Sequence, residues 1–205
     1  MGLQGSGVAN HSYVHPPAWY SSVPGARSAT INVTFDAFFP DLAKPAVEHA
    51  ADIWAQSIEA VVPIQIQVFW DSLPPNYLGF GSPYETVHDF DGAEFANRQY
   101  AIALANQMAG QDLNPDAPDF VIRFAKDAEW HLGVDGQPED DEYDLVTVAL
   151  HEMTHGLGFL GSANIVGVSG YIGFQGIPYV FDQFVEESDG TAILDLSLIH
   201  ISEPT

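Results

Sequence analysis

The stretch that most constrains this chain is an apolar run that carries two histidines four residues apart, Val146-Thr-Val-Ala-Leu-His151-Glu152-Met-Thr-His155. Residues four apart lie on one face of a helix, so His151 and His155 can present two imidazoles to one ion. Zinc binds imidazole nitrogen at about 2.0–2.1 Å in a tetrahedral shell, and a catalytic site keeps one position open for water. Glu152 lies beside His151, where a carboxylate can take a proton from that water. The stretch therefore predicts a helix that carries a zinc site.

The residues on either side of this run predict where the helix begins and ends. Asp144 is a good N-cap for a helix that begins at Leu145 and runs to about Leu157. Gly158 can take the left-handed conformation that ends a helix and turns the chain. We expect one side of the helix to bury against a sheet, through Leu145, Val148, Ala149 and Leu150. We expect His151, Glu152 and His155 to face a cleft.

Alternating apolar and polar residues predict three strands, at residues 29–38, 64–70 and 120–124. Between the first two, apolar residues recur at helical spacing. Asp41 is a plausible N-cap for that helix, and Pro45 suits its first turn. These elements predict an α/β (α+β) domain with a sheet and a backing helix.

The remaining segments predict a second helix and two irregular regions. Helix formers fill residues 100–109 and are followed by Gly110, which is typical of a helix end. Residues 71–97 are rich in glycine and proline and are interpreted as loop. The aromatic segment 179–187 is either a strand or a short helix, because its period does not distinguish the two. Residues 1–28 are interpreted as an irregular arm.

The charge of the chain limits its partners. The 205 residues include 28 Asp plus Glu against 5 Lys plus Arg, a net charge of -23. Such a surface repels phosphate backbones and anionic lipids, so we expect no nucleic acid and no membrane partner. Most of the acidic residues are expected to be solvated, and a calcium ion (Ca2+) held by some Asp clusters is the alternative. The chain has no cysteine, which excludes thiolate metal sites and disulfides.

The residues from His151 to Phe159 resemble the zincin metallopeptidases, in which His-Glu-x-x-His-x-x-Gly is shared by metzincin-type and leishmanolysin-like enzymes. The segment Phe181-Asp182-Gln183-Phe184 is similar to a Tyr/Phe-Asp-x-Phe segment in a bacterial family of secreted zincins. The resemblance implies a zincin-like fold with a twisted mixed sheet and an active-site helix. It also implies a Zn2+ cofactor, hydrolysis of a protein or peptide substrate, and secretion, although residues 1–7 lack the features of a signal peptide.

The chain departs from the metzincin pattern at Gly161, where the resemblance implies a third metal ligand. Glycine has no side chain to ligate, so the third ligand must come from another position. Asp182, a carboxylate among aromatics, is the first candidate, with helix capping or pairing with an arginine as its alternative role. Further candidates are Glu186, Glu187 and His131, which are alternatively solvated or surface residues. Candidates to stabilise the oxyanion are Tyr171, Tyr179 and His131.

The end of the chain has a different character. Residues 197–205 resemble a translated sequencing adapter, which predicts a catalytic domain over 29–196 whose natural chain continues beyond it. No methionine follows Met153, so the Met-turn of metzincins is expected outside this chain. We expect a monomer. Two other classes stay open: a zinc-binding domain without activity, and an acidic, calcium-stabilised extracellular binding module.

Overall fold

The computed structural model describes residues 29–166 and 169–195. The predicted arm at residues 1–28 and the predicted tail at residues 197–205 lie outside the described residues. Within the described part, no helix is both long and apolar enough to cross a membrane.

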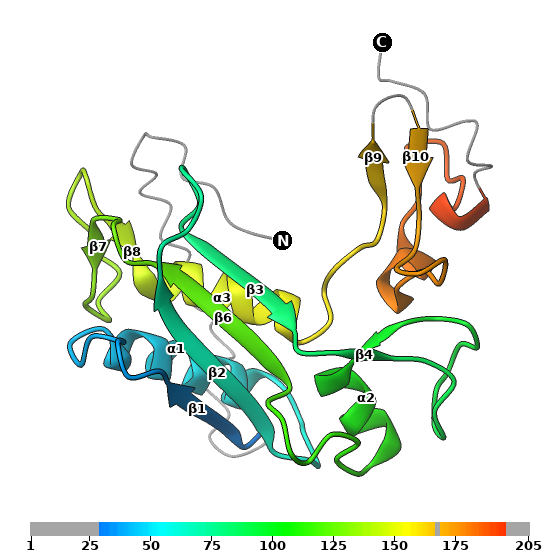
Figure 1. Cartoon of the computed structure of the whole chain (residues 1–205), viewed down its shortest axis with the longest axis horizontal. Coiled ribbons are helices and arrows are strands. Elements are labelled where there is room, and N and C mark those ends of the chain that lie inside the picture. Colours follow the sequence, from blue (N-terminus) through cyan, green and yellow to red (C-terminus); the bar gives the residue numbers. More distant parts are fainter. Residues whose placement is uncertain (1–28, 167–168, 196–205) are drawn as a thin grey trace.

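A four-stranded mixed sheet forms the body of the molecule (Figure 1), with the strand order β1-β2-β6-β3. Its strands are β1 (Ile31–Phe35), β2 (Ile64–Asp71), β6 (Phe120–Ala125) and β3 (Gly79–Pro83). The first three run parallel to one another, and β3 pairs with β6 in the antiparallel direction. The three strands predicted from alternation are therefore confirmed, and so is the mixed α/β class at this coarse level.

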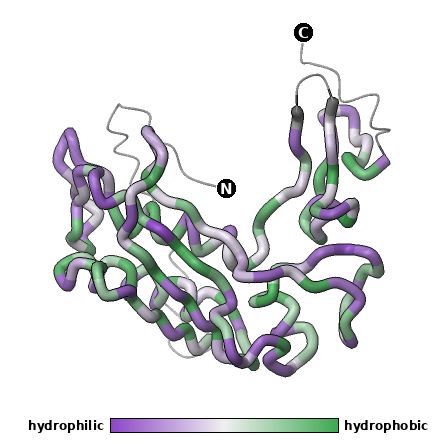
Figure 2. The backbone as a smooth tube through the Cα atoms, in the orientation of Figure 1, coloured by the Kyte–Doolittle hydropathy of each residue, from purple (hydrophilic) through white to green (hydrophobic). Residues whose placement is uncertain are grey.

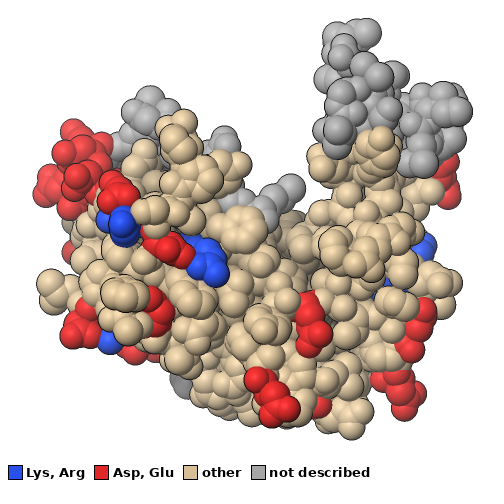
Figure 3. Space-filling view, in the orientation of Figure 1, with Lys and Arg blue, Asp and Glu red and all other residues tan. Residues whose placement is uncertain are grey.

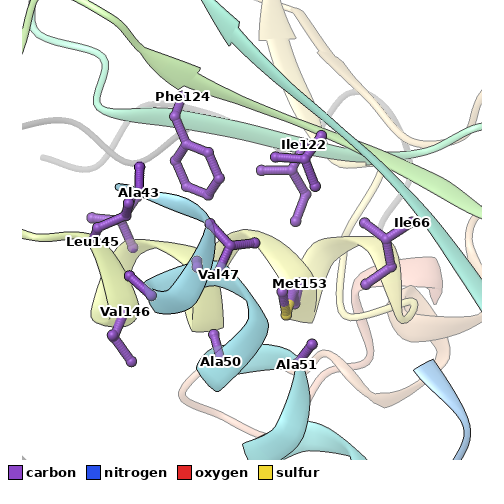
Figure 4. Close-up of a cluster of buried hydrophobic side chains, with 14 of the residues drawn as sticks. Ala43, Val47, Ala50, Ala51, Ile66, Ile122, Phe124, Leu145, Val146 and Met153 are labelled. Carbon is purple, nitrogen blue, oxygen red and sulfur yellow. The ribbon is translucent and has the colours of Figure 1, made fainter. Parts of the chain in front are cut away.

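The two long helices, α1 (Lys44–Ser57) and α3 (Leu145–Gly156), pack on the same face of this sheet. Alternate strand residues point into that layer and are at most 1% exposed: Ile64, Ile66, Val68, Phe120, Ile122 and Phe124. Figure 4 shows several of them meeting Val47, Leu145 and Met153 from the helices. Figure 2 shows the hydrophobic residues along the strands and helices, with hydrophilic residues at the loop joining β7 and β8. Burial of these side chains, at about 25 cal/mol per Å² of apolar surface, is what holds α3 in place.

Short elements complete the described chain. They are β4 (Thr86–Val87), β5 (Tyr100–Ala101), α2 (Ile102–Ala109), β7 (Trp130–His131), β8 (Tyr143–Asp144), β9 (Asn164–Val166), β10 (Ser169–Tyr171), η1 (Val180–Phe184) and η2 (Ile193–Asp195). Gly110 has a φ of 67° and ends α2, as predicted. The ambiguous segment 179–187 contains the short 3-10 helix η1 and no strand of the main sheet.

The predicted N-cap of α1 is wrong. The helix begins at Lys44 after Ala43, which makes no side-chain capping bond, and Pro45 lies in the first turn as predicted. Asp41 instead accepts a hydrogen bond from the Lys44 ammonium at 2.6 Å. A carboxylate three residues before a lysine can accept a hydrogen bond either from the ammonium or from a backbone N–H of the first helical turn. The residue pattern alone does not tell which of these two bonds forms.

The interpretation of residues 71–97 as loop is also wrong in part, because the segment contains β3. This strand reads Gly79-Phe-Gly81-Ser-Pro83 and has low intrinsic strand propensity. It is held by its antiparallel pairing with β6 and by packing against α3. Tertiary contacts thus override local propensity here.

The chain that follows α3 builds a small lobe that stands beside the sheet. Figure 1 shows the chain leaving α3 and rising to β9 and β10, and Figure 3 shows the surface hollowed between this lobe and the sheet. The lobe is tied to the body by the segment before α2: Gln99 N–H donates to Pro178 O at 2.8 Å, and Val180 N–H donates to Gln99 O at 2.9 Å. Arg98 donates to the Gln183 side chain at 2.9 Å. These bonds fix the lobe to the segment before α2.

Replacing Gly156 tests how tightly α3 packs on the sheet. A Cβ at this position would overlap the ring of Phe120 in β6, with Phe120 Cδ1 only 2.8 Å away. Gly156→Ala is expected to lower the free energy of unfolding by roughly 1–3 kcal/mol through overpacking, although alanine favours helix over glycine by about 1 kcal/mol. Chemical denaturation measures this, with Asp52→Ala on the exposed side of α1 as the control. A stabilised Gly156→Ala protein would contradict the close packing.

Candidate metal centre

The two histidines of the helical motif converge, as the sequence predicts. His151 and His155 lie one turn apart on α3, with ring centroids 4.8 Å apart and ring planes at 87°. Their Nε2 atoms lie 3.1 Å apart. Two nitrogens bound to one tetrahedral zinc at about 2.0–2.1 Å would lie ~3.3–3.4 Å apart, so a small adjustment makes this pair fit the ion. A hydrogen bond between one protonated and one bare Nε2 is the alternative account of the same distance.

The tautomer of His155 follows from its other ring nitrogen. Nδ1 lies 2.9 Å from the carbonyl oxygen of Phe159. A carbonyl oxygen can only accept a hydrogen bond, so Nδ1 carries a proton, and in a neutral imidazole the lone pair is then on Nε2. The lone pair points toward Nε2 of His151. A backbone acceptor on the far nitrogen is the support that metal-binding histidines usually have.

Burial differs between the two imidazoles. His155 is 6% exposed, whereas His151 is open to solvent. The His155 imidazole is therefore fixed by its surroundings, and the His151 imidazole is accessible to solvent. This arrangement suits a site that an ion and a substrate must both reach.

Glu152 does not face an open cleft, and the prediction that it does is wrong. Its side chain is fully buried beneath β3, and one carboxylate oxygen, Oε2, accepts a hydrogen bond from Gly81 N–H at 2.6 Å. The reason is that β3 crosses α3 on the side where Glu152 projects. The backbone N–H orients the carboxylate, as a charge-assisted hydrogen bond does.

Two glycines of β3 allow this close approach. An added Cβ at Gly79 would lie 2.8 Å from Glu152 Cγ, and one at Gly81 would overlap the Glu152 carbonyl oxygen. Only residues without a side chain fit at these two positions. Neither glycine was predicted to lie at the site, because residues 71–97 were interpreted as loop. The Gly-x-Gly alternation is the sequence signal that could have indicated them.

The turn after α3 is built as expected at Gly158. The residue has a φ of 113°, which disfavours side-chain-bearing residues. Its N–H donates to His155 O at 3.1 Å, and Phe159 N–H donates to Thr154 O at 3.1 Å. The predicted role of Gly158 as the structural turn is confirmed. The turn brings the Phe159 carbonyl back to the His155 ring.

The Asp182 carboxylate lies next to Gly161, the position at which the metzincin pattern has its third metal ligand. An added Cβ on Gly161 would lie 3.1 Å from Asp182 Oδ1. The carboxylate is 1% exposed and accepts from Ser162 N–H at 2.9 Å, from Tyr179 N–H at 2.9 Å and from the Ser162 hydroxyl. It thereby caps η1 and fastens the chain after the turn. The capping alternative is therefore present, and the ligand role stays a prediction.

The other candidates for the third ligand are Glu186, Glu187 and His131, and in the described part of the chain none of them forms a metal-binding group with the His151–His155 pair. Glu186 and Glu187 are exposed in the turn after η1. His131 lies in β7 and contacts Asp135 at 2.7 Å and Glu142 at 3.5 Å. The His131 side-chain hydrogen bond is the largest influence that lowers the pKa of Asp135.

The two tyrosines proposed as helpers differ in environment. Burial, and then the charge of Asp182, raises the pKa of Tyr179, so this phenol keeps its proton at neutral pH. Tyr171 is half exposed on β10.

Across residues 29–166 and 169–195, the structure brings His151 and His155 together but gathers no set of three His, Cys, Asp or Glu side chains that would hold a metal ion. In this part of the chain, two imidazoles lie where they could bind one ion, and no third side chain of these types joins them. Comparison of the chain with protein-family models, curated proteins and solved structures found no match. The case for function therefore depends on the geometry of the site.

Removing the Asp182 carboxylate tests its fastening role without metal. Asp182→Ala leaves three buried or half-buried donors of Ser162 and Tyr179 unpaired, and hydrogen bonds to charged groups contribute about 1.5–3 kcal/mol each. We expect the metal-free variant to lose roughly 2–4 kcal/mol of unfolding free energy, while Glu187→Ala at an exposed carboxylate stays within ~0.5 kcal/mol of wild type. Equal melting of the metal-free wild type and Asp182→Ala proteins would contradict this role.

Zinc titration of the same two variants tests the ligand prediction. Loss of a ligand is expected to weaken zinc binding by more than the ~10–100-fold typical of a supporting residue. Unchanged zinc affinity in folded Asp182→Ala protein would remove Asp182 from the ligand set.

Proposed function

We propose that this chain is a zinc-dependent endopeptidase domain, with His151 and His155 as metal ligands and Glu152 as general base. The observation that carries the proposal is the convergence of the two Nε2 atoms at 3.1 Å, with the His155 tautomer fixed by the Phe159 carbonyl. An ordinary helix surface does not require either feature. The resemblance of residues 151–159 to zincins, which includes Glu152 and Gly158 as well as the two histidines, supports the same proposal from the sequence.

Each residue has a defined part in this proposal. His151 and His155 hold the ion, and Asp182, through Ser162, fastens the chain that supports His155. Zinc, when bound, polarises the scissile carbonyl and lowers the pKa of water toward neutrality. Glu152 accepts the proton of the attacking water and returns it to the leaving amine. Gly81 N–H holds the carboxylate in one orientation during both transfers.

A zinc-binding domain without activity is the second candidate. It is favoured by the burial of Glu152 beneath β3, since a base must reach the water whose proton it takes. Catalysis in the proposed enzyme requires that water reach Glu152 once ion and substrate are bound. The two candidates therefore differ in one measurable property, turnover by zinc-loaded protein.

Zinc content and turnover together test the proposal. We expect zinc-loaded wild type to hold one zinc per chain and to cleave a quenched fluorescent casein substrate. Glu152→Gln keeps the acceptor for Gly81 N–H and should retain zinc, but lose activity by about 10²–10⁴-fold. His155→Ala should lose zinc itself, and Asp52→Asn, at an exposed carboxylate of α1, should match wild type.

The outcomes separate the candidates. One zinc per chain with no turnover supports the inactive domain. Absence of zinc at micromolar free metal removes both candidates. Turnover that survives in Glu152→Gln removes the assigned base.

A further inference from the structure

The main sheet has one face that α1 and α3 do not cover. Alternate residues of β1, β2, β6 and β3 point away from the two helices, and these outward residues are called the open face. Figure 1 shows both long helices behind the sheet, so the open face is turned toward the viewer. In β3, Gly79 and Gly81 point the other way, because a Cβ on either would meet Glu152. Phe80 and Ser82 alternate with them and therefore belong to the open face.

A polar row crosses the open face. The strand register pairs Thr34 with Gln67, Gln67 with Val121, and Val121 with Ser82. These four side chains therefore lie in a line across all four strands, and the line is about 14 Å long because neighbouring strands are ~4.8 Å apart. Gln67 Nε2 donates to Thr34 O at 3.2 Å, which holds the amide along the strand surface. Amides and hydroxyls both donate and accept hydrogen bonds, so the row can pair with groups that do the same.

An aromatic row lies beside the polar row. The register pairs Phe69 with Arg123 and Arg123 with Phe80. The central carbon of the Arg123 guanidinium lies 4.4 Å from the Phe69 ring centroid, and one NH group of Arg123 donates to the Asp71 carboxylate. Cation–π attraction and the ion pair thus hold the guanidinium in one place. The Phe80 ring is 39% exposed, so the row presents apolar surface next to fixed polar groups.

The open face has almost no net charge, although the chain is strongly acidic. Across the four described strands, Asp71 is the one acidic residue that points outward, and Arg123 pairs with it. The whole chain has 28 Asp plus Glu and a net charge of -23. Figure 3 shows the middle of this face as largely uncharged, with the largest group of acidic side chains at the β7–β8 end. A partner at the open face therefore meets amides, hydroxyls and aromatic rings instead of a field of carboxylates.

We propose that the open face binds a neutral polysaccharide, with sugar rings on the exposed aromatic surface of Phe80 and sugar hydroxyls paired with the Gln67 amide and the polar row. Sugar rings have apolar C–H faces that an aromatic ring can bury, and their hydroxyls donate and accept as amides do.

Charge decides between this partner and others. An anionic polymer is repelled by a net charge of -23, and so is a second copy of this chain. A cationic partner has the acidic surfaces as better targets. A neutral polymer meets neither effect. The inference does not use the histidine pair, so it stands apart from the proposed peptidase function.

Sedimentation with insoluble polysaccharides tests the inference. Metal-free wild-type protein is mixed with microcrystalline cellulose, with chitin and with granular starch, and the protein left in the supernatant gives the association constant. We expect binding to at least one of the three polymers, unchanged by added salt because no net charge is neutralised. Phe80→Ala should weaken binding about 10–100-fold, since burial of the ring is lost. Gln67→Ala should weaken it about 3–10-fold, since the amide bonds are lost.

Controls separate a local effect from misfolding. Phe38, in the turn before α1, is 82% exposed and lies outside the four strands, so Phe38→Ala should bind as wild type does. Phe80→Thr keeps a residue that favours strands and is the substitute variant if Phe80→Ala does not fold.

The outcomes decide the inference independently of zinc. Wild-type protein that binds none of the three polymers overturns it, and so does binding that is unchanged in both Phe80→Ala and Gln67→Ala. Sedimentation velocity gives a further outcome: a wild-type dimer that Phe80→Ala converts to monomer would make the open face an interface between two copies and would overturn the polysaccharide site. Because the protein is metal-free, none of these results depends on peptidase activity.

Discussion

The close approach of α3 to the sheet is the constraint on which the rest of the structure depends. Gly156 lets the helix lie against the Phe120 ring of β6, and Gly79 and Gly81 let β3 lie against Glu152. Interiors are packed nearly as densely as organic crystals, so these three positions leave no room for a methyl group. The helix is therefore held from two strands, and the directions in which its side chains point are fixed with it. This packing therefore fixes the positions of the side chains of the candidate metal centre.

The chemistry of the site follows from which side of α3 each residue occupies. Glu152 projects toward β3 and is buried with a backbone donor, while His151 projects toward solvent and His155 toward the turn. The turn returns the Phe159 carbonyl to His155, and Asp182 fastens the following residues through Ser162. The three side chains come from five consecutive residues, yet Glu152 is buried under β3, His151 is exposed to solvent and His155 is buried against the turn.

The sequence could predict what depends on local pattern. Alternation located β1, β2 and β6, and helical spacing with Asp144 as N-cap located α3, where Asp144 accepts from Thr147 N–H at 2.9 Å. The sequence could not predict β3, because glycine has a low strand propensity. The reason for Gly79 and Gly81 in this strand is their close contact with α3, which the sequence alone does not show. The burial of Glu152 was missed for the same reason. For Asp182 the capping alternative is the one seen in the structure, and the ligand role stays a prediction; sequence alone does not say that its partners are Ser162 and Tyr179.

The central claim is that His151 and His155 bind one zinc ion through Nε2. X-ray absorption at the zinc edge of the zinc-loaded wild-type protein tests it most directly, because imidazole ligands give a distinct multiple-scattering pattern. The account predicts two imidazole nitrogens at about 2.0–2.1 Å, with lighter N or O donors completing a shell of four. In His151→Ala protein, one imidazole should be lost. A first shell made only of oxygen atoms, or a spectrum unchanged by His151→Ala, would contradict the account.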